Sequence, residues 1–174
     1  MEGSQQEIDR DTLARVASGD QTAFATLYDR LSGPLYSLAV RMLGDAAEAQ
    51  DVLQDVFLQI WRRSASYDAK QSSVFSWAIL MTRGRVIDRL RARGRRLRVV
   101  SASTDDANQL DLAANASVAP SGADTVEGND EAERVRSIVN ELPAEQRQAI
   151  ELAFFTDLTH QEIAAQLNQP LGTI

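Results

Sequence analysis

Apolar side chains recur at helical spacing through most of the first hundred residues. The clearest stripe lies at i, i+3, i+4, i+7, i+8, i+11 and i+12, and comprises Ala49, Val52, Leu53, Val56, Phe57, Ile60 and Trp61. Such a stripe is typical of an amphipathic helix with one buried face. Glycine, proline and alternating β-branched residues are scarce between residues 10 and 98. We therefore predict that this whole segment is helical.

Helix boundaries in the first part follow from capping residues. Asp11 or Thr12 can cap a first helix that turns Leu13 and Val16 inward. Residues 21–31 form a second helical pattern.

Three further signals divide the chain up to residue 98. Pro34 fits the first turn of a third helix, and Gly44 fits its end. After the striped helix, a polar loop runs from Ser64 to Ser73. A long helix is then predicted from roughly Val74 to Arg96, apolar at its start and basic at its end.

The composition changes sharply from Val99 to about Asp130. This segment is rich in Ser, Ala, Asp, Asn and Gly, and it has no aromatic or basic residue. It has too little apolar surface to offset the entropy of ordering, which predicts a flexible linker. We therefore expect an all-α protein with an N-terminal helical bundle (10–98), a flexible acidic linker (99–130) and a small C-terminal helical domain (131–174).

Helical periodicity returns after the linker and predicts a helix-turn-helix. Pro143 opens a helix, and a Thr-x-x-Glu capping box then precedes a short second one. An asparagine suited to a left-handed turn follows, and a last helix begins at the end of the sequence. The residues of this pattern are Thr159, Glu162, Ile163, Ala164, Asn168, Thr173 and Ile174. The pattern also fits a plain helical hairpin, so both interpretations stay open on spacing alone.

Charge is distributed very unevenly. Between Met81 and Arg98 the chain carries eight arginines and one acid, within a protein whose net charge is −7. Arginine outnumbers lysine seventeen to one, which suits two-pronged contacts to phosphate. A solvated basic face is the simpler explanation, but the clustering favours a polyanion such as nucleic acid.

Two other groups of residues admit two interpretations each. Trp61, Tyr67, Phe75 and Trp77 cluster around the Ser64–Ser73 loop, either as core residues or as a stacking platform for unpaired bases. On the polar face of the striped helix, Glu48, Asp51, Gln54 and Asp55 are either a hydrated surface or a binding surface.

Several function classes are disfavoured by composition. The chain has no cysteine, and it shows no Ser-His-Asp arrangement, glycine-rich phosphate loop or metal-spaced cluster. We therefore expect no enzymatic activity, no metal and no cofactor. No apolar run approaches the roughly 20 residues of a membrane span, and the N-terminus does not resemble a secretory signal, so a cytoplasmic location is expected.

Taken together, these segments resemble the bacterial sigma factors of the extracytoplasmic-function type, with their regions 2 and 4. The segment Asp51 to Arg62 is similar to the Asp-x-x-Gln-Glu-x-Phe-x-x-x-Trp-Arg motif of region 2. In that family this helix docks on the clamp helices of the largest subunit of core RNA polymerase. The resemblance thus implies that the polymerase-binding residues are Glu48, Asp51, Gln54 and Asp55.

The segment Phe75 to Arg91 is similar to the family's helix that recognises and melts the minus-ten promoter element, mainly on the single-stranded non-template strand. Arg83, Asp88 and Arg91 match that motif directly, whereas Gly84 stands where the family usually has asparagine. The basic stripes and the neighbouring loop complete the expected DNA-binding set, which is Tyr67, Trp77, Arg83, Arg85, Asp88, Arg89, Arg91, Arg95 and Arg96.

The helix-turn-helix resembles region 4, which reads the minus-thirty-five element. In the family, the side chains that enter the major groove follow the position of Ile174. We therefore expect a recognition helix that is incomplete in this chain. The resemblance also implies an anti-sigma partner that covers the polymerase-binding surfaces. Two alternatives remain: a stand-alone helix-turn-helix regulator, and an inactive fragment that titrates anti-sigma factor.

Overall fold

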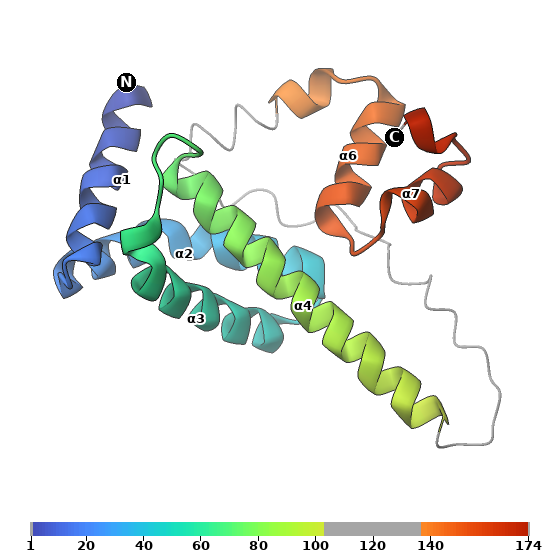
Figure 1. The fold of residues 1–174 in the computed structure, drawn as a ribbon, viewed down its shortest axis with the longest axis horizontal. Coiled ribbons are helices and arrows are strands. Elements are labelled where there is room, and N and C mark those ends of the chain that lie inside the picture. The colour runs from blue at the N-terminus through green and yellow to red at the C-terminus, as the bar shows by residue number, and fades with distance from the viewer. Residues whose placement is uncertain (1, 103–136, 174) are drawn as a thin grey trace.

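The computed structural model describes residues 2–102 and 137–173, and every regular element in those two ranges is helical (Figure 1). The all-α prediction is thereby confirmed. The N-terminal bundle consists of α1 (Glu2–Ala17), α2 (Gln21–Leu43), α3 (Ala46–Arg63), the 3₁₀ turn η1 (Ser64–Ser66) and α4 (Val74–Ala102).

The core of the bundle lies where α1, α3 and α4 pack around α2. Leu27 and Leu35 of α2, Val56 of α3 and Val86 of α4 are each at most 1% exposed. Burying an aliphatic side chain of this size stabilises the fold by roughly 1.5–3 kcal/mol, so these contacts hold the four helices together.

Helix α3 has the predicted amphipathic pattern. Six of the seven striped residues are buried, and the seventh, Trp61, is half-buried against Phe24 with ring centroids 5.2 Å apart. Asp45 caps the N-terminus of the helix, where its side chain accepts a hydrogen bond from the Glu48 N–H at 2.9 Å. Just before it, Gly44 ends α2 with φ of 69°, a left-handed conformation that favours glycine, as the sequence predicts.

The predicted start of the first helix is wrong. Leu13 and Val16 are buried as expected, but α1 already begins at Glu2, nine residues before Asp11. Thr12 does not cap a helix: its hydroxyl donates to the Ile8 carbonyl at 2.7 Å, a bond made inside a helix. The upstream turn is held by Asp9, which is 4% exposed and forms an ion pair with Arg30 of α2.

The predicted break before Pro34 is also wrong, because α2 runs through the proline without interruption. A proline inside a helix costs about 3 kcal/mol, since it removes a hydrogen bond and crowds the preceding turn. Leu31 and Leu35 lie on either side of it and are 1% and 0% exposed. Their burial offsets that cost and keeps both halves of the helix in line.

Helix α4 begins at Val74 as predicted, where the Ser73 hydroxyl accepts from the Ser76 N–H at 3.1 Å. It continues to Ala102 and so extends past Arg96 into the segment predicted to be a linker. Residues 103–130 of that segment lie outside the described residues.

The C-terminal unit contains α6 (Ala144–Phe155), α7 (His160–Gln166) and the 3₁₀ turn η3 (Leu171–Thr173). Pro143 stands at the N-terminal boundary of α6, as the sequence predicts. Among the described residues of this unit, only Ile163 and Ala164 are buried. Its own core is therefore very small.

Candidate functional site

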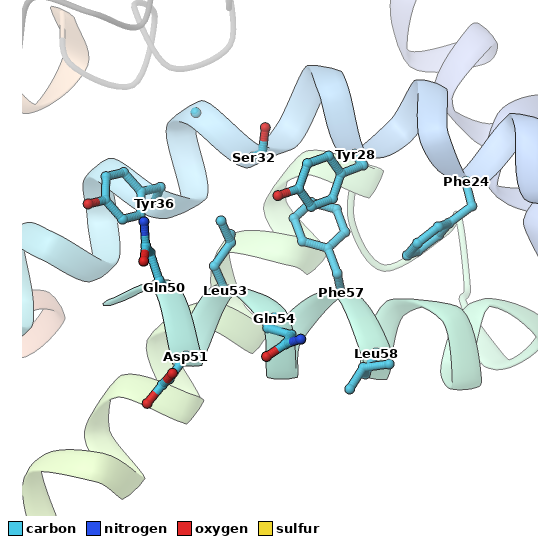
Figure 2. A pocket seen from close by; sticks show the side chains of 11 residues that line it. Phe24, Tyr28, Ser32, Tyr36, Gln50, Asp51, Leu53, Gln54, Phe57 and Leu58 are labelled. Atoms are coloured by element: carbon cyan, nitrogen blue, oxygen red, sulfur yellow. The ribbon is translucent and has the colours of Figure 1, made fainter. Parts of the chain in front are cut away.

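A groove of about 800 Å³ opens between α2 and α3 on the surface of the bundle (Figure 2). Its floor is aromatic: the rings of Tyr28 and Phe57 lie 4.5 Å apart. Tyr28 and Leu58 remain 42% and 47% exposed, which is high for large apolar side chains. Such an exposed apolar strip with polar edges is typical of a protein-binding surface.

The acidic face of α3 borders this groove. Asp51 and Gln54 line it, and Figure 2 shows the Asp51 carboxylate directed away from α2. The side chain of Asp51 is 65% exposed, and Asp55 and Gln54 are exposed as well. Glu48 differs, because its side chain is only 32% exposed and its Oε2 lies 4.0 Å from Nε of Arg89.

The arginines of α4 do not all face open solvent. Two of them contact α3. Nη2 of Arg89 lies 2.9 Å from Oδ2 of Asp51. The Gln59 amide oxygen, when turned toward α4, accepts from Arg85 at 2.9 and 3.0 Å. The basic helix and the acidic helix are thus bonded directly to each other.

Two further arginines of α4 contact the C-terminal unit. Arg83 donates through Nε to the Phe154 carbonyl at 2.8 Å and through Nη2 to the Ala153 carbonyl at 2.7 Å. Arg91 forms a bidentate pair with the Asp157 carboxylate: Nε donates to Oδ2 at 3.0 Å, and Nη2 lies 2.7 Å from Oδ1. The hydrogen bond to Asp157, together with its charge, raises the pKa of Arg91.

The remaining expected contacts on α4 are open to solvent. Asp88, Arg95 and Arg96 are exposed. Gly84 is also exposed, and a Cβ placed there would meet nothing within 4 Å. The Cβ of an asparagine at this position would therefore meet no steric obstacle.

The aromatic residues around the loop divide into two pairs. Phe75 is 8% exposed and Trp61 packs on Phe24, so both belong to the core. Tyr67 and Trp77 are half-buried, with ring centroids 5.3 Å apart. The Tyr67 hydroxyl donates to the Ser72 carbonyl at 2.7 Å and so closes the loop on itself.

The predicted capping box at the start of α7 is present. The Thr159 N–H donates to Glu162 Oε2 at 2.7 Å, and the Glu162 N–H donates back to the Thr159 hydroxyl. The Thr159 N–H, together with the Thr159 hydroxyl that donates to the same Oε2 at 2.8 Å, lowers the pKa of Glu162. Asn168 adopts φ of 52°, and a 3₁₀ turn with exposed Thr173 follows. Ile174 lies outside the described residues.

Sequence reasoning missed two residues at the end of α6, Phe154 and Phe155, which contact the N-terminal bundle. Arg41, at the end of α2, stacks on the Phe155 ring at 4.0 Å, and Arg83 lies 5.6 Å from the centre of the Phe154 ring. More than fifty residues separate these partners along the chain. The only available signal was the two adjacent phenylalanines, which local periodicity assigns simply to a helix.

Within residues 2–102 and 137–173, no group of three or more His, Cys, Asp or Glu side chains could hold a metal ion. In the same ranges, no helix combines the length and apolar character that crossing a membrane requires.

Two family models match this chain. Residues 27–96 match Sigma-70 region 2, and residues 132–174 match Sigma-70, region 4. Among curated proteins, the ECF RNA polymerase sigma factor SigK of Mycobacterium tuberculosis H37Rv is 33% identical, over 93% of this chain and 83% of its own length. SigK of Mycobacterium sp. strain KMS is 36% identical, over 95% of this chain and 83% of its own length.

Two solved structures resemble the chain more loosely. CnrH in complex with the cytosolic domain of CnrY has a TM-score of 0.43 and 24% identity, covering 95% of this chain and 86% of CnrH. The sigma factor RpoE in complex with the anti-sigma factor NepR, from Bartonella quintana, has a TM-score of 0.43 and 20% identity, with 86% of each chain covered.

Proposed function

Because this chain belongs to the sigma-70 family of RNA polymerase sigma factors, within the extracytoplasmic-function type, we propose that two faces of its N-terminal bundle divide the work of initiation. The α3 face binds core polymerase, and the α4 face binds promoter DNA. The observation that carries this assignment is the exposed acidic rim of α3 beside an open apolar groove.

The α3 face combines two kinds of attraction. Tyr28 and Leu58 offer apolar area in the groove, while Asp51 presents a carboxylate on its edge and Asp55 a second exposed carboxylate one turn further along α3. Apolar contacts supply affinity, and charges at a rim mainly steer encounter and fix orientation. A basic and apolar helix pair, such as the polymerase clamp helices, is the partner that this surface would accept.

The α4 face supplies cations and half-buried aromatics. Arg95 and Arg96 are exposed and can neutralise phosphates, which fixes register without reading sequence. Tyr67 and Trp77 lie near the start of the same helix and could stack on unpaired bases. The pair between Arg89 and Asp51 is well exposed, so it contributes only about 0–1 kcal/mol and can be exchanged for outside partners.

The free chain should bind DNA weakly. Its net charge of −7 repels a polyanion, and the basic helix is local. Core polymerase would overcome this repulsion by holding the helix at the promoter. The chain would thus contribute binding and strand capture rather than catalysis, in the cytoplasm where the polymerase works. An anti-sigma partner that occupies the groove would block the same surface.

The polymerase assignment is tested by reversing one charge on the α3 rim. Asp55→Lys should weaken binding to core polymerase by about tenfold or more, because it places a cation against a basic partner. Asp11→Lys makes the same charge change at an exposed position of α1 and serves as the control. Equal affinities of the two variants for core polymerase would refute the proposed face.

The function itself is tested by transcription from templates with randomised promoter segments. Core polymerase plus this chain should enrich a common upstream motif among the transcribed templates, and Asp55→Lys should lose most of that activity. Specific binding of a promoter by the chain alone, unaffected by Asp55→Lys, would favour the stand-alone regulator. Core binding without any transcription would favour the inactive fragment.

A further inference from the structure

The outward face of α4 changes in character along the helix. Ala78, Thr82 and Val86 are each 0% exposed and define the face that packs on the bundle. Residues three or four apart share one side of a helix. The row on the opposite side comprises Trp77, Leu80, Gly84, Asp88, Arg91 and Arg95. Its first half is apolar, and its second half is polar and mostly basic.

We propose that Leu80, in the apolar half of this row, is a specificity-determining residue that contacts the 5-methyl group of a thymine in the opened promoter strand. The inference rests on the proposed function of α4 as the DNA-binding helix. It adds to that function one residue and the chemical group that this residue recognises.

The exposure of Leu80 has no explanation in the folding of the chain. At 58%, it is the most exposed large apolar side chain among the described residues. The C-terminal unit contacts α4 at Arg83 and Arg91 but leaves Leu80 open. An apolar side chain stabilises a fold only by leaving water, so Leu80 contributes little to stability. A lone exposed leucine is common on protein surfaces, and its neighbours therefore decide whether it has a function.

The neighbours of Leu80 favour DNA as its partner. About one turn earlier, Trp77 forms the half-buried aromatic pair with Tyr67, with ring centroids 5.3 Å apart. Further along the row, Arg91 and Arg95 are exposed cations. An unpaired strand of DNA offers apolar base faces to the first group and phosphates to the second. Apolar and basic residues along one row thus complement a single strand.

The spacing along the helix allows neighbouring bases to be contacted. Leu80 lies about 4.5 Å along the axis from Trp77, because each residue of an α-helix rises by about 1.5 Å. Neighbouring bases of one strand are about 3.4 Å apart. A strand that stacks one base on Trp77 therefore brings the next base within reach of Leu80.

Gly84 explains why the contact should select thymine. It is exposed and carries no side chain, so the turn after Leu80 lacks the amide that an asparagine would offer to a base. The 5-methyl group of thymine is the apolar substituent on the base edges. Packing it on Leu80 leaves no polar group without a partner, whereas packing an amino group there would. Leu80 beside a bare glycine thus favours a methyl group.

The test compares thymine with deoxyuracil, which lacks only the 5-methyl group. The probe is the single-stranded non-template oligonucleotide of a promoter that the chain transcribes, bound to the complex of the chain with core polymerase. Its thymines are replaced by deoxyuracil one at a time. One replacement should weaken binding about fourfold, because burial of one such group contributes about 0.8 kcal/mol.

Leu80→Ala should abolish this difference and bind the thymine and deoxyuracil forms equally. Leu80→Met keeps an apolar side chain of similar size and should retain most of the difference. Ile8→Ala removes a side chain of comparable exposure, 52%, from α1 and is the control that should keep the fourfold ratio. Both oligonucleotides are compared on the same variant, so a general loss of stability cancels from the ratio.

Two results would overturn the role of Leu80. The first is a starting chain that binds every deoxyuracil form as tightly as the thymine form. The second is a fourfold ratio that persists in Leu80→Ala.

Failure of this inference can be told apart from failure of the proposed function. If the chain and core polymerase transcribe no promoter, both proposals fail. If transcription occurs and depends on Asp55, but no methyl effect depends on Leu80, the proposed function stands and the role of Leu80 fails.

Discussion

The two helical units of this protein are built on different principles. In the N-terminal bundle, four helices share a continuous core in which residues such as Leu35, Val56 and Val86 are completely buried. In the described part of the C-terminal unit, Ile163 and Ala164 alone are buried, and α6 contributes no buried residue. The bundle can therefore hold a binding surface rigid, whereas the C-terminal unit depends on caps and on contacts with whatever it lies against.

The largest effect on stability is expected from a cavity in the core of the N-terminal bundle. Leu35→Ala removes a fully buried side chain from the centre of α2 and should lower the free energy of unfolding by about 2–5 kcal/mol. Urea denaturation followed by far-UV circular dichroism measures the change. Leu58→Ala, at a position 47% exposed, is the control and should cost well under half as much. Similar losses would mean that the core does not dominate stability.

The matching change in the C-terminal unit acts on a cap. Thr159→Ala removes the hydroxyl that accepts from the Glu162 N–H and should destabilise α7 by about 1 kcal/mol. Amide hydrogen exchange should quicken in α7 and leave α2 and α3 unchanged. Gln161→Ala, on the exposed side of α7, is the control. Faster exchange throughout the bundle would show that the two units unfold together.

A smaller effect of opposite sign is expected from replacing a helical glycine in the bundle. Gly84→Ala should stabilise the bundle by about 0.5–1 kcal/mol, because glycine is a poor helix former and the added methyl group meets nothing within 4 Å. The thermal midpoint of the bundle should rise, while hydrogen exchange in α7 stays the same. A lower midpoint would indicate that this position needs glycine for close packing.

The smallest effect concerns acid. The Ala23 backbone N–H and Arg15 hold the pKa of Asp20 below its ordinary value of 3.8. The carboxylate therefore stabilises the start of α2 fully above that value, and this contribution is lost as pH falls through the lower pKa of the folded state. The thermal midpoint should decline less steeply between about pH 5 and pH 2 in Asp20→Asn. An unchanged slope would contradict a role for the charge, and Asp29→Asn is the control.

Local chemistry in the sequence determined most of the elements. The stripe of α3, the left-handed end at Gly44, the capping box of Thr159 and the turn at Asn168 all depend on residues within one or two helical turns. These interactions join residues that are close in sequence, so the spacing of residue types is enough to predict them.

Only the tertiary structure decided what distant segments do to one another. Pro34 stays inside α2 because buried leucines on both sides outweigh its cost, and α1 extends upstream because Asp9 meets Arg30. The ion-pair partners of the α4 arginines are also distant in sequence: Arg89 pairs with Asp51 of α3, and Arg91 pairs with Asp157 of the C-terminal unit. A guanidinium binds any anion in reach, so the sequence determines that the charge is there and the fold determines which anion it meets.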